Sequence, residues 1–296
     1  MKNKSKLLFL LFFIIFFLQV SAQNSFWKKS DSLNIKKRNT LVIAETSAYV
    51  ISMVSLNQLW YANYPKSSFH TINDNGEWLQ MDKMGHAMTS YYVGKLGMEL
   101  MSWTGETENN KIIYGAGLGF AFLTTVEVFD GFSKEWGFST GDIIANASGT
   151  TLLIGQELLW KEQRIQYKYS FHQTHFANQN PNLLGSNFIE QSLKDYNGQT
   201  YWLSANLWSF NKSSKMPKWL NLAIGYGAEN MISGYPNNND SRNRQFYLSF
   251  DVDLTKIKTK SKLLKSVFKA INFIKIPAPT LSYSKQNNFK FNYIYF

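Results

Sequence analysis

The sequence predicts an α+β protein, with an N-terminal bundle of about four apolar helices followed by a C-terminal antiparallel sheet of about six strands. Up to Trp160 the chain contains four long apolar segments, whereas after Trp160 apolar and polar residues alternate with a period of two. The length of 296 residues suits one large or two ordinary domains. Hydrophobic residues make up 44% of the chain and charged residues 17%, which argues against a disordered protein.

An export signal precedes the predicted fold. Three lysines in the first six residues are followed by an apolar stretch, 7–18, and by the small-residue cleavage site Val20-Ser21-Ala22. We expect residues 1–22 to be removed, because the apolar stretch is short for a membrane span; an uncleaved anchor helix is the alternative. Removal would lower the net charge from +11 to +8. Outside the cytoplasm nucleic acid is not an expected partner, so the positive charge favours anionic lipid or polymer surfaces.

The helical domain is predicted over residues 23–160. Its four apolar segments are 41–62, 86–103, 112–129 and 143–160. Each has about the length of a membrane span, yet each contains polar residues. A buried four-helix core and a membrane-embedded bundle both fit this pattern. We favour a bundle that contacts the membrane, because the segments are apolar on more than one face.

Residues 161–296 are predicted to form the β region. The strand candidates are 165–171, 201–210, 219–227, 246–254, 280–284 and 289–296. Six strands are too few for a closed membrane barrel, which needs about eight. The sheet must therefore pack on the helices, pair with further strands or form an oligomer through its edges. Near 256–272, lysines surround apolar residues at helical spacing and predict a basic amphipathic helix, placed either on an anionic membrane or on the sheet.

Ionisable and polar residues enter the apolar helices in three pairs. The pairs are Asp82 with His86, Glu127 with Asp130, and Asp142 with Asn146. A spacing of three or four residues places each pair on one face of its helix. Charges in apolar surroundings are costly unless they are paired or bind a cation. The candidate ligands of a divalent metal ion are therefore His86, Glu127, Asp130 and Asp142.

Each of these residues also has a structural interpretation. Asp82 can cap the helix that follows it, and Ser139 with Asp142 has the form of a capping box. Asn146 can bond to a neighbouring helix, and Glu127 or Asp130 can pair with a lysine.

Two functional interpretations remain beside the structural one. In the binding interpretation Asp82, Lys83, Ser139 and Asn146 hold the head group of a membrane lipid or envelope glycolipid. In the catalytic interpretation His86 and Asp142 are the catalytic residues, with His86 as general base beside a metal-activated water.

The same residues resemble a known family. Residues 82–86, the pair Glu127 and Asp130, and residues 139–149 are similar to the D-K-x-x-H, E-x-x-D and S-x-x-D-x-x-A-N-x-x-G blocks of the YfiM-like family of predicted periplasmic lipoproteins. A similar order of blocks occurs in VanZ-like membrane proteins, which tend to have Gln in place of Asp130. The resemblance spans residues 81 to about 149 and implies an envelope protein of a Gram-negative bacterium. It implies site positions but no reaction, because the YfiM-like family has no established activity.

Several classes of function are excluded. The chain has no cysteine, so it cannot contain disulfides, thiolate metal sites or the lipid-modified cysteine of a lipoprotein. The common hydrolase, nucleotide and zinc-protease motifs are missing as well. We therefore predict an exported protein of the outer membrane or periplasm, membrane-associated, with a structural or lipid-binding role. The alternative is a metal-assisted hydrolase or transferase that acts on an envelope lipid.

Overall fold

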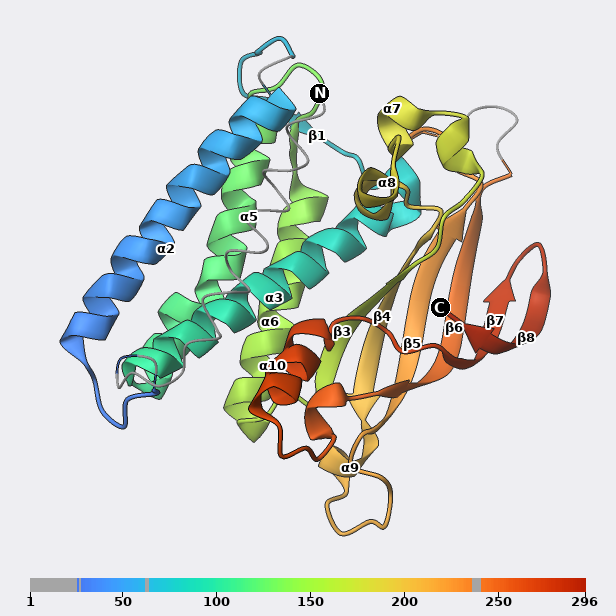
Figure 1. Ribbon diagram of the computed structural model, residues 1–296. Helices are drawn as coiled ribbons and strands as arrows, with labels where there is room; N and C mark the ends of the chain where they lie inside the picture. Colours follow the sequence, from blue (N-terminus) through green and yellow to red (C-terminus); the bar gives the residue numbers. More distant parts are fainter. Residues whose placement is uncertain (1–25, 27, 62–63, 236–240) are drawn as a thin grey trace.

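The computed structural model describes residues 26, 28–61, 64–235 and 241–296 (Figure 1). The predicted signal, residues 1–22, lies outside the described residues. Helices form one side of the molecule and the sheet forms the other. The predicted α+β class and the antiparallel sheet of six strands are confirmed.

The predicted apolar segments are helical throughout their described residues. The long helices are α2 (Ile35–Leu56), α3 (Met81–Thr104), α5 (Gly117–Asp130) and α6 (Thr140–Trp160). Shorter turns connect or extend them: η2 (Asn57–Tyr61), η3 (Glu77–Gln80), α4 (Glu108–Asn110) and η4 (Lys111–Ala116). The remaining short helices accompany the sheet: η5 (Phe176–Asn178), α7 (Pro181–Leu184), α8 (Phe188–Lys194), α9 (Leu207–Phe210), η6 (Leu254–Lys256) and α10 (Lys262–Ile271).

Helix α3 lies at the centre of the bundle because glycines let its neighbours approach its backbone. A Cβ atom on Gly149 of α6 would lie 1.9 Å from the carbonyl oxygen of Ala87. A Cβ atom on Gly119 of α5 would lie 2.0 Å from the carbonyl oxygen of Ser90. The backbones of α5 and α6 are therefore in direct contact with α3, which brings polar side chains of three helices together.

Among the described residues, two helical stretches are long and apolar enough to cross a membrane by length and composition alone. They are Ile35–Leu56, with 11% of its 18-residue apolar window buried, and Glu108–Asp130, with 28% of its window buried. Core helices and signal sequences can meet the same criteria. Membrane contact by the bundle thus stays a prediction.

The sheet is an antiparallel meander in which each strand pairs with the next in sequence. Its strands are β3 (Ile165–Phe171), β4 (Gln199–Asn206), β5 (Leu220–Glu229), β6 (Asn243–Val252), β7 (Ala278–Ser284) and β8 (Asn288–Tyr295). Residues 207–210 were expected to continue β4 but form α9, because the Asn206 side chain accepts a hydrogen bond from the Ser209 amide and caps a helix there. The basic segment near 256–272 contains α10, which begins at Lys262 after the Ser261 cap.

In the helical half of the sheet, one face and the outer edge of β3 are covered. Helix α3 packs on β3 and β4 through Tyr91 against Tyr167 and through Met81 against Tyr201. The outer edge of β3 is occupied by residues 273–275, since the Tyr169 amide donates to the Phe273 carbonyl at 2.8 Å and the Lys275 amide to the Tyr169 carbonyl at 2.9 Å. An oligomer through the β8 edge stays a prediction.

Candidate functional site

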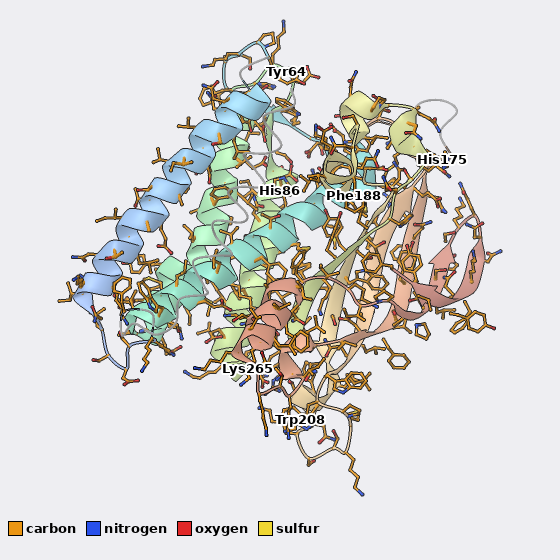
Figure 2. The ribbon with its side chains drawn as sticks, viewed as in Figure 1. Tyr64, His86, His175, Phe188, Trp208 and Lys265 are labelled. Carbon is orange, nitrogen blue, oxygen red and sulfur yellow. The ribbon has the colours of Figure 1, made fainter. Side chains whose placement is uncertain are left out.

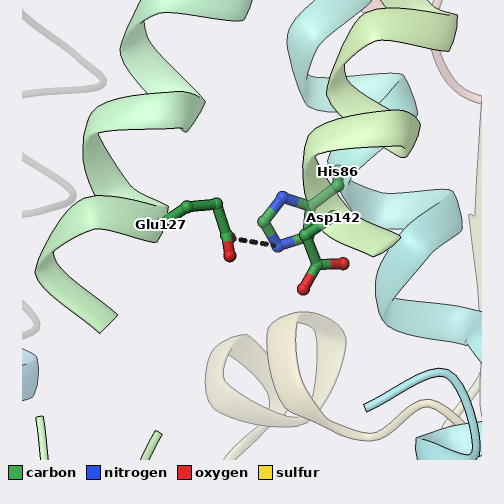
Figure 3. A group of neighbouring side chains, drawn as sticks. All are labelled: His86, Glu127 and Asp142. Atoms are coloured by element: carbon green, nitrogen blue, oxygen red, sulfur yellow. Dashed lines mark ion pairs between the residues drawn. The ribbon is translucent and has the colours of Figure 1, made fainter. Parts of the chain in front are cut away.

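Three helices each contribute one side chain to a compact group. His86 comes from α3, Glu127 from α5 and Asp142 from α6 (Figure 3). The imidazole Nε2 lies 3.6 Å from Glu127 Oε1. One ligand atom from each of the three residues lies within 4.8 Å of the other two. Both carboxylates are buried, whereas the His86 side chain is 23% exposed, so the group is reached from one side.

The orientation of His86 is fixed by Asn146. The Asn146 Oδ1 atom lies 3.1 Å from His86 Nδ1. An amide oxygen at this position requires a proton on Nδ1, which leaves the lone pair of Nε2 directed toward Glu127. An oxygen acceptor behind a histidine is the usual arrangement at metal centres, where it fixes the tautomer and ring orientation.

Lys83 links Asp142 to two further carboxylates. Its Nζ atom lies 2.7 Å from Asp74, 2.9 Å from Asp82 and 3.0 Å from Asp142. Asp142 therefore belongs both to this cluster and to the group around His86. The ammonium compensates the carboxylates around it, whereas Glu127 pairs with His86.

Ser139 connects the two groups at the start of α6. Its hydroxyl donates to Asp74 at 2.6 Å and accepts from the Asp142 amide at 3.1 Å, which confirms the predicted cap. Its amide donates to Glu127 Oε2 at 3.2 Å. Ser139 reaches Asp74 because β1 (Thr71–Ile72) and β2 (Phe138–Ser139) pair in parallel.

Asp130 is separate from the group around His86. It accepts a hydrogen bond from the Tyr61 hydroxyl at 2.6 Å. Of the four predicted metal ligands, His86, Glu127 and Asp142 form one group and Asp130 lies outside it. Among the described residues, Asp142 also forms a second group of carboxylates with Asp74 and Asp82.

Burial perturbs the acids near His86. Desolvation raises the pKa of Glu127 to about 8, and the charges of Asp142 and Asp130 add to the effect. Burial also raises the pKa of Asp130 to about 6, although the Tyr61 hydrogen bond opposes it. The pKa of Asp142 is raised by burial as well, against the attraction of His86 and Lys83. Desolvation is the main cause of all three shifts, and neighbouring carboxylates add to it.

The cluster around Lys83 is better compensated. Burial would raise the pKa of Asp74, but hydrogen bonds from Lys83 and Ser139 outweigh burial and lower it. Burial would lower the pKa of the Lys83 ammonium, but Asp82 and the other two carboxylates raise it. The pKa of Asp82 is raised, mainly by desolvation. This cluster is an internal ion network, and its lysine is fully engaged.

The structure thus assigns places to the other predicted residues. Asp82, Lys83, Ser139 and Asn146 all lie around the site, and each bonds to another site residue. Two participants, Asp74 and Tyr61, were not identified from the sequence. Asp74 lies in a polar loop whose composition predicts only a turn, and nothing in the sequence indicates that this loop pairs with residues 138–139.

Comparison with known proteins gives one finding on this region. Residues 70–155 match a family described as predicted periplasmic lipoproteins (DUF2279). The matched range includes every candidate site residue named above except Tyr61. Neither the curated proteins nor the solved structures contain a match. The match supports the predicted location: the chain is an exported protein, in the periplasm or at the outer membrane.

Proposed function

We propose that this protein binds a divalent metal ion between α3, α5 and α6 and uses it to hold the polar head group of an envelope lipid or glycolipid. The observation that carries the proposal is the group formed by His86, Glu127 and Asp142, whose ligand atoms lie within 4.8 Å of one another. Two buried carboxylates beside an imidazole with a free Nε2 lone pair are a common ligand set for Zn²⁺, Mn²⁺ or Fe²⁺.

The charge of the site also favours a cation. Binding of a divalent ion would release the proton that burial holds on Glu127, and the ion would add to the positive charge that Lys83 already supplies to Asp142. Asn146 would keep Nε2 aimed at the ion, and Ser139 would hold Glu127 and the start of α6.

Three protein ligands leave coordination positions open for a head group. The exposed side of His86 gives access, and phosphate or hydroxyl oxygens would complete the metal shell. In this proposal Asp82, Lys83 and Ser139 position the ligands through their ion pairs and hydrogen bonds, and Asn146 orients His86 through Oδ1.

The metal content of the purified protein tests the proposal. We expect close to one divalent ion per chain by elemental analysis, lost in His86→Ala and retained in His175→Ala, a histidine outside the site. Inorganic phosphate and glycerol phosphate should then bind the metal-loaded protein and not the chelated protein in calorimetric titrations. Wild-type protein that holds no divalent ion, and whose melting temperature does not respond to added Zn²⁺ or Mn²⁺, would contradict the proposal.

A second candidate is a metal-assisted hydrolase or transferase. It is favoured by the open coordination positions, since a metal ion with three protein ligands can lower the pKa of a bound water. His86 is poorly placed as general base, because Nδ1 faces Asn146 and Nε2 faces Glu127. Asp130, with a pKa of about 6, is better suited to accept a proton near neutral pH. Metal-dependent release of a soluble head group from envelope lipid extract, lost in Asp130→Asn with the metal retained, would distinguish this candidate from binding alone.

A further inference from the structure

The strands far from the helices have an inverted pattern of burial. In β6 the apolar side chains of Phe246, Leu248 and Phe250 are 49%, 44% and 52% exposed, while the alternate residues Tyr247, Ser249 and Asp251 are buried. In β5 Leu222 and Ile224 are likewise exposed, with Asn221 and Ala223 buried between them. A half-buried sheet in water has the opposite pattern, with polar residues outside and apolar residues inside.

The exposed apolar residues form one continuous surface. The register places Leu248 opposite Ile224 on one side and Leu281 on the other, and Leu281 opposite Phe291. We call this surface the outer wall: it consists of Leu222, Ile224, Phe246, Leu248, Phe250, Leu281, Tyr283, Phe289 and Phe291. The same face of β3 and β4 is covered by α3, through Tyr167, Tyr201 and Leu203, so the outer wall is the part that the helices leave uncovered.

The polar contacts on the buried face are specific to this register. Lys168 and Asp251 form an ion pair of 3.3 Å with both side chains fully buried. The Ser204 hydroxyl donates to Asp251 at 2.6 Å, and the Thr280 hydroxyl donates to Ser249 at 2.8 Å. A shift of one residue would expose this network and bury the wall, so the two faces are fixed together. Apolar side chains outside and satisfied polar groups inside are the pattern of strands that face lipid.

The length and the ends of the wall agree with a lipid environment. β5 and β6 have 10 residues each, and a tilted strand needs about 9–11 to cross the hydrocarbon layer. At the end where β5 begins and β6 ends, Lys218 and Lys256 lie over the Trp208 ring, at 4.2 and 5.6 Å from its centre. In Figure 2 Trp208 and Lys265 both lie toward this end of the molecule, away from His86. Tryptophan and lysine are typical of the head-group level, where lysine meets anionic phosphate.

We infer that the outer wall lies against the acyl chains of a phospholipid bilayer, with its lysine-rich end at the anionic phosphates. The inference does not depend on the metal site, because it uses none of the residues around His86. The lipid-contacting surface is then on the sheet, whereas the sequence favoured membrane contact by the helical bundle.

The lack of cysteine permits a direct test with single labels. Leu248→Cys on the wall and Leu193→Cys on α8, which is 64% exposed, are each labelled with bimane in the full chain. The labelled proteins are added to vesicles of phosphatidylcholine and phosphatidylglycerol, with or without brominated acyl chains. We expect the label at residue 248 to shift to shorter wavelength and to be quenched by the brominated chains, and the label at residue 193 to remain in water.

Two results would overturn the inference. A label at residue 248 that iodide quenches as strongly as the label at residue 193 would show that the wall faces water. Disulfide-linked dimers of Leu248→Cys without quenching by brominated lipid would show that a second copy covers the wall. Ile224→Cys, on the neighbouring strand, repeats the measurement at a second wall position and guards against a local effect of one substitution.

Discussion

Lys83 holds three carboxylates that would otherwise repel one another. It lies within 3.0 Å of Asp74, Asp82 and Asp142, and its side chain is 11% exposed. Lys83→Met should therefore lower the free energy of unfolding by about 3–5 kcal/mol, because it leaves buried charge without a partner. Urea denaturation at neutral pH measures the loss, with Lys285→Met in the exposed β7–β8 turn as the control. Equal free energies of unfolding for the two variants would show that the ion pairs of Lys83 do not stabilise the fold.

Glu162 gives a prediction about pH at a residue outside the site. Its carboxylate forms ion pairs with Lys256 at 2.6 Å and with Lys212 at 3.0 Å. Burial raises its pKa, but the hydrogen bonds from these lysines outweigh burial and lower the pKa to about 2. The folded pKa is below the unfolded value of about 4.3, so the stabilisation is fully present above pH 4.3 and is lost as the pH falls toward 2.

The comparison with Glu162→Gln isolates this effect. The stability advantage of the wild-type protein over the variant should be constant near neutral pH and should shrink below about pH 4.3. Melting temperatures of both proteins between pH 2 and pH 7 provide the measurement. A difference in melting temperature that does not change with pH would mean that the Glu162 carboxylate gains no stabilising ion pair in the folded state.

At the scale of elements, the bundle depends on how closely α6 approaches α3. Gly149 faces the Ala87 carbonyl, and backbone cannot move aside as a flexible side chain can. Gly149→Ala should cost about 1–3 kcal/mol or more through overpacking. At Gly155 in the same helix, a Cβ atom would meet no described heavy atom within 4 Å beyond its chain neighbours and the backbone of its own helix, so Gly155→Ala should be neutral or stabilising by up to about 1 kcal/mol.

Thermal unfolding of the two alanine variants tests this contact. Because both substitutions add one methyl group to α6, their difference removes the effect of helix propensity. Under the proposed metal binding, Gly149→Ala should also lose metal more readily than Gly155→Ala, since it would displace Asn146 and Asp142 from α3. Similar melting curves for the two variants would mean that α3 and α6 are not in backbone contact at this point.

The elements themselves could be predicted because hydrophobic periodicity determines them. The switch from long apolar segments to alternation near Trp160 located both halves, and the serine three residues before Asp142 located the start of α6. The converging pairs likewise followed from helical spacing, which is why His86, Glu127 and Asp142 were identified. Asp74 could not be identified, because its position depends on the pairing of β1 with β2, two short strands far apart in sequence.

The inverted sheet was missed for a different reason. Alternation shows that a strand has two unlike faces, but it does not show which face meets the core. Six alternating strands therefore predicted a sheet correctly while leaving open whether Phe246, Leu248 and Phe250 were inside. The buried ion pair of Lys168 and Asp251 shows that the polar face is inside. The two residues are 83 positions apart, and a single sequence does not indicate that they are in contact.

At the scale of the whole molecule, positive charge gathers at one end. The exposed lysines 258, 260, 262 and 265 lie on or just before α10, and Lys212, Lys215 and Lys218 precede β5 at the same end of the sheet. A groove of about 810 Å³ between α3 and α10 is lined by Lys95, Lys256 and Lys265 among others. The carboxylates around His86 line no part of this groove.

Removing lysines from this end should weaken binding to anionic membranes. The triple variant Lys260→Gln, Lys262→Gln and Lys265→Gln should lose on the order of 100-fold in affinity for phosphatidylglycerol vesicles, at about 1 kcal/mol for each lysine near the surface. The loss should diminish in high salt, where the wild-type protein also binds more weakly. Co-sedimentation over a range of salt concentrations measures it, and vesicles of phosphatidylcholine alone are the control. Equal binding of variant and wild type to both vesicles would place the lysines away from the membrane.

The meander also bears on how the chain folds. Each strand from β3 to β8 pairs with its successor, so the sheet can grow one hairpin at a time with little loop entropy to overcome. The contact of residues 273–275 with Tyr169 is the exception, because it joins segments about a hundred residues apart. We expect the amides of Tyr169 and Lys275 to gain protection from hydrogen exchange after those of β4 and β5. The edge of β3 would then stay open, and able to pair wrongly with other chains, until the last quarter of the protein has been made.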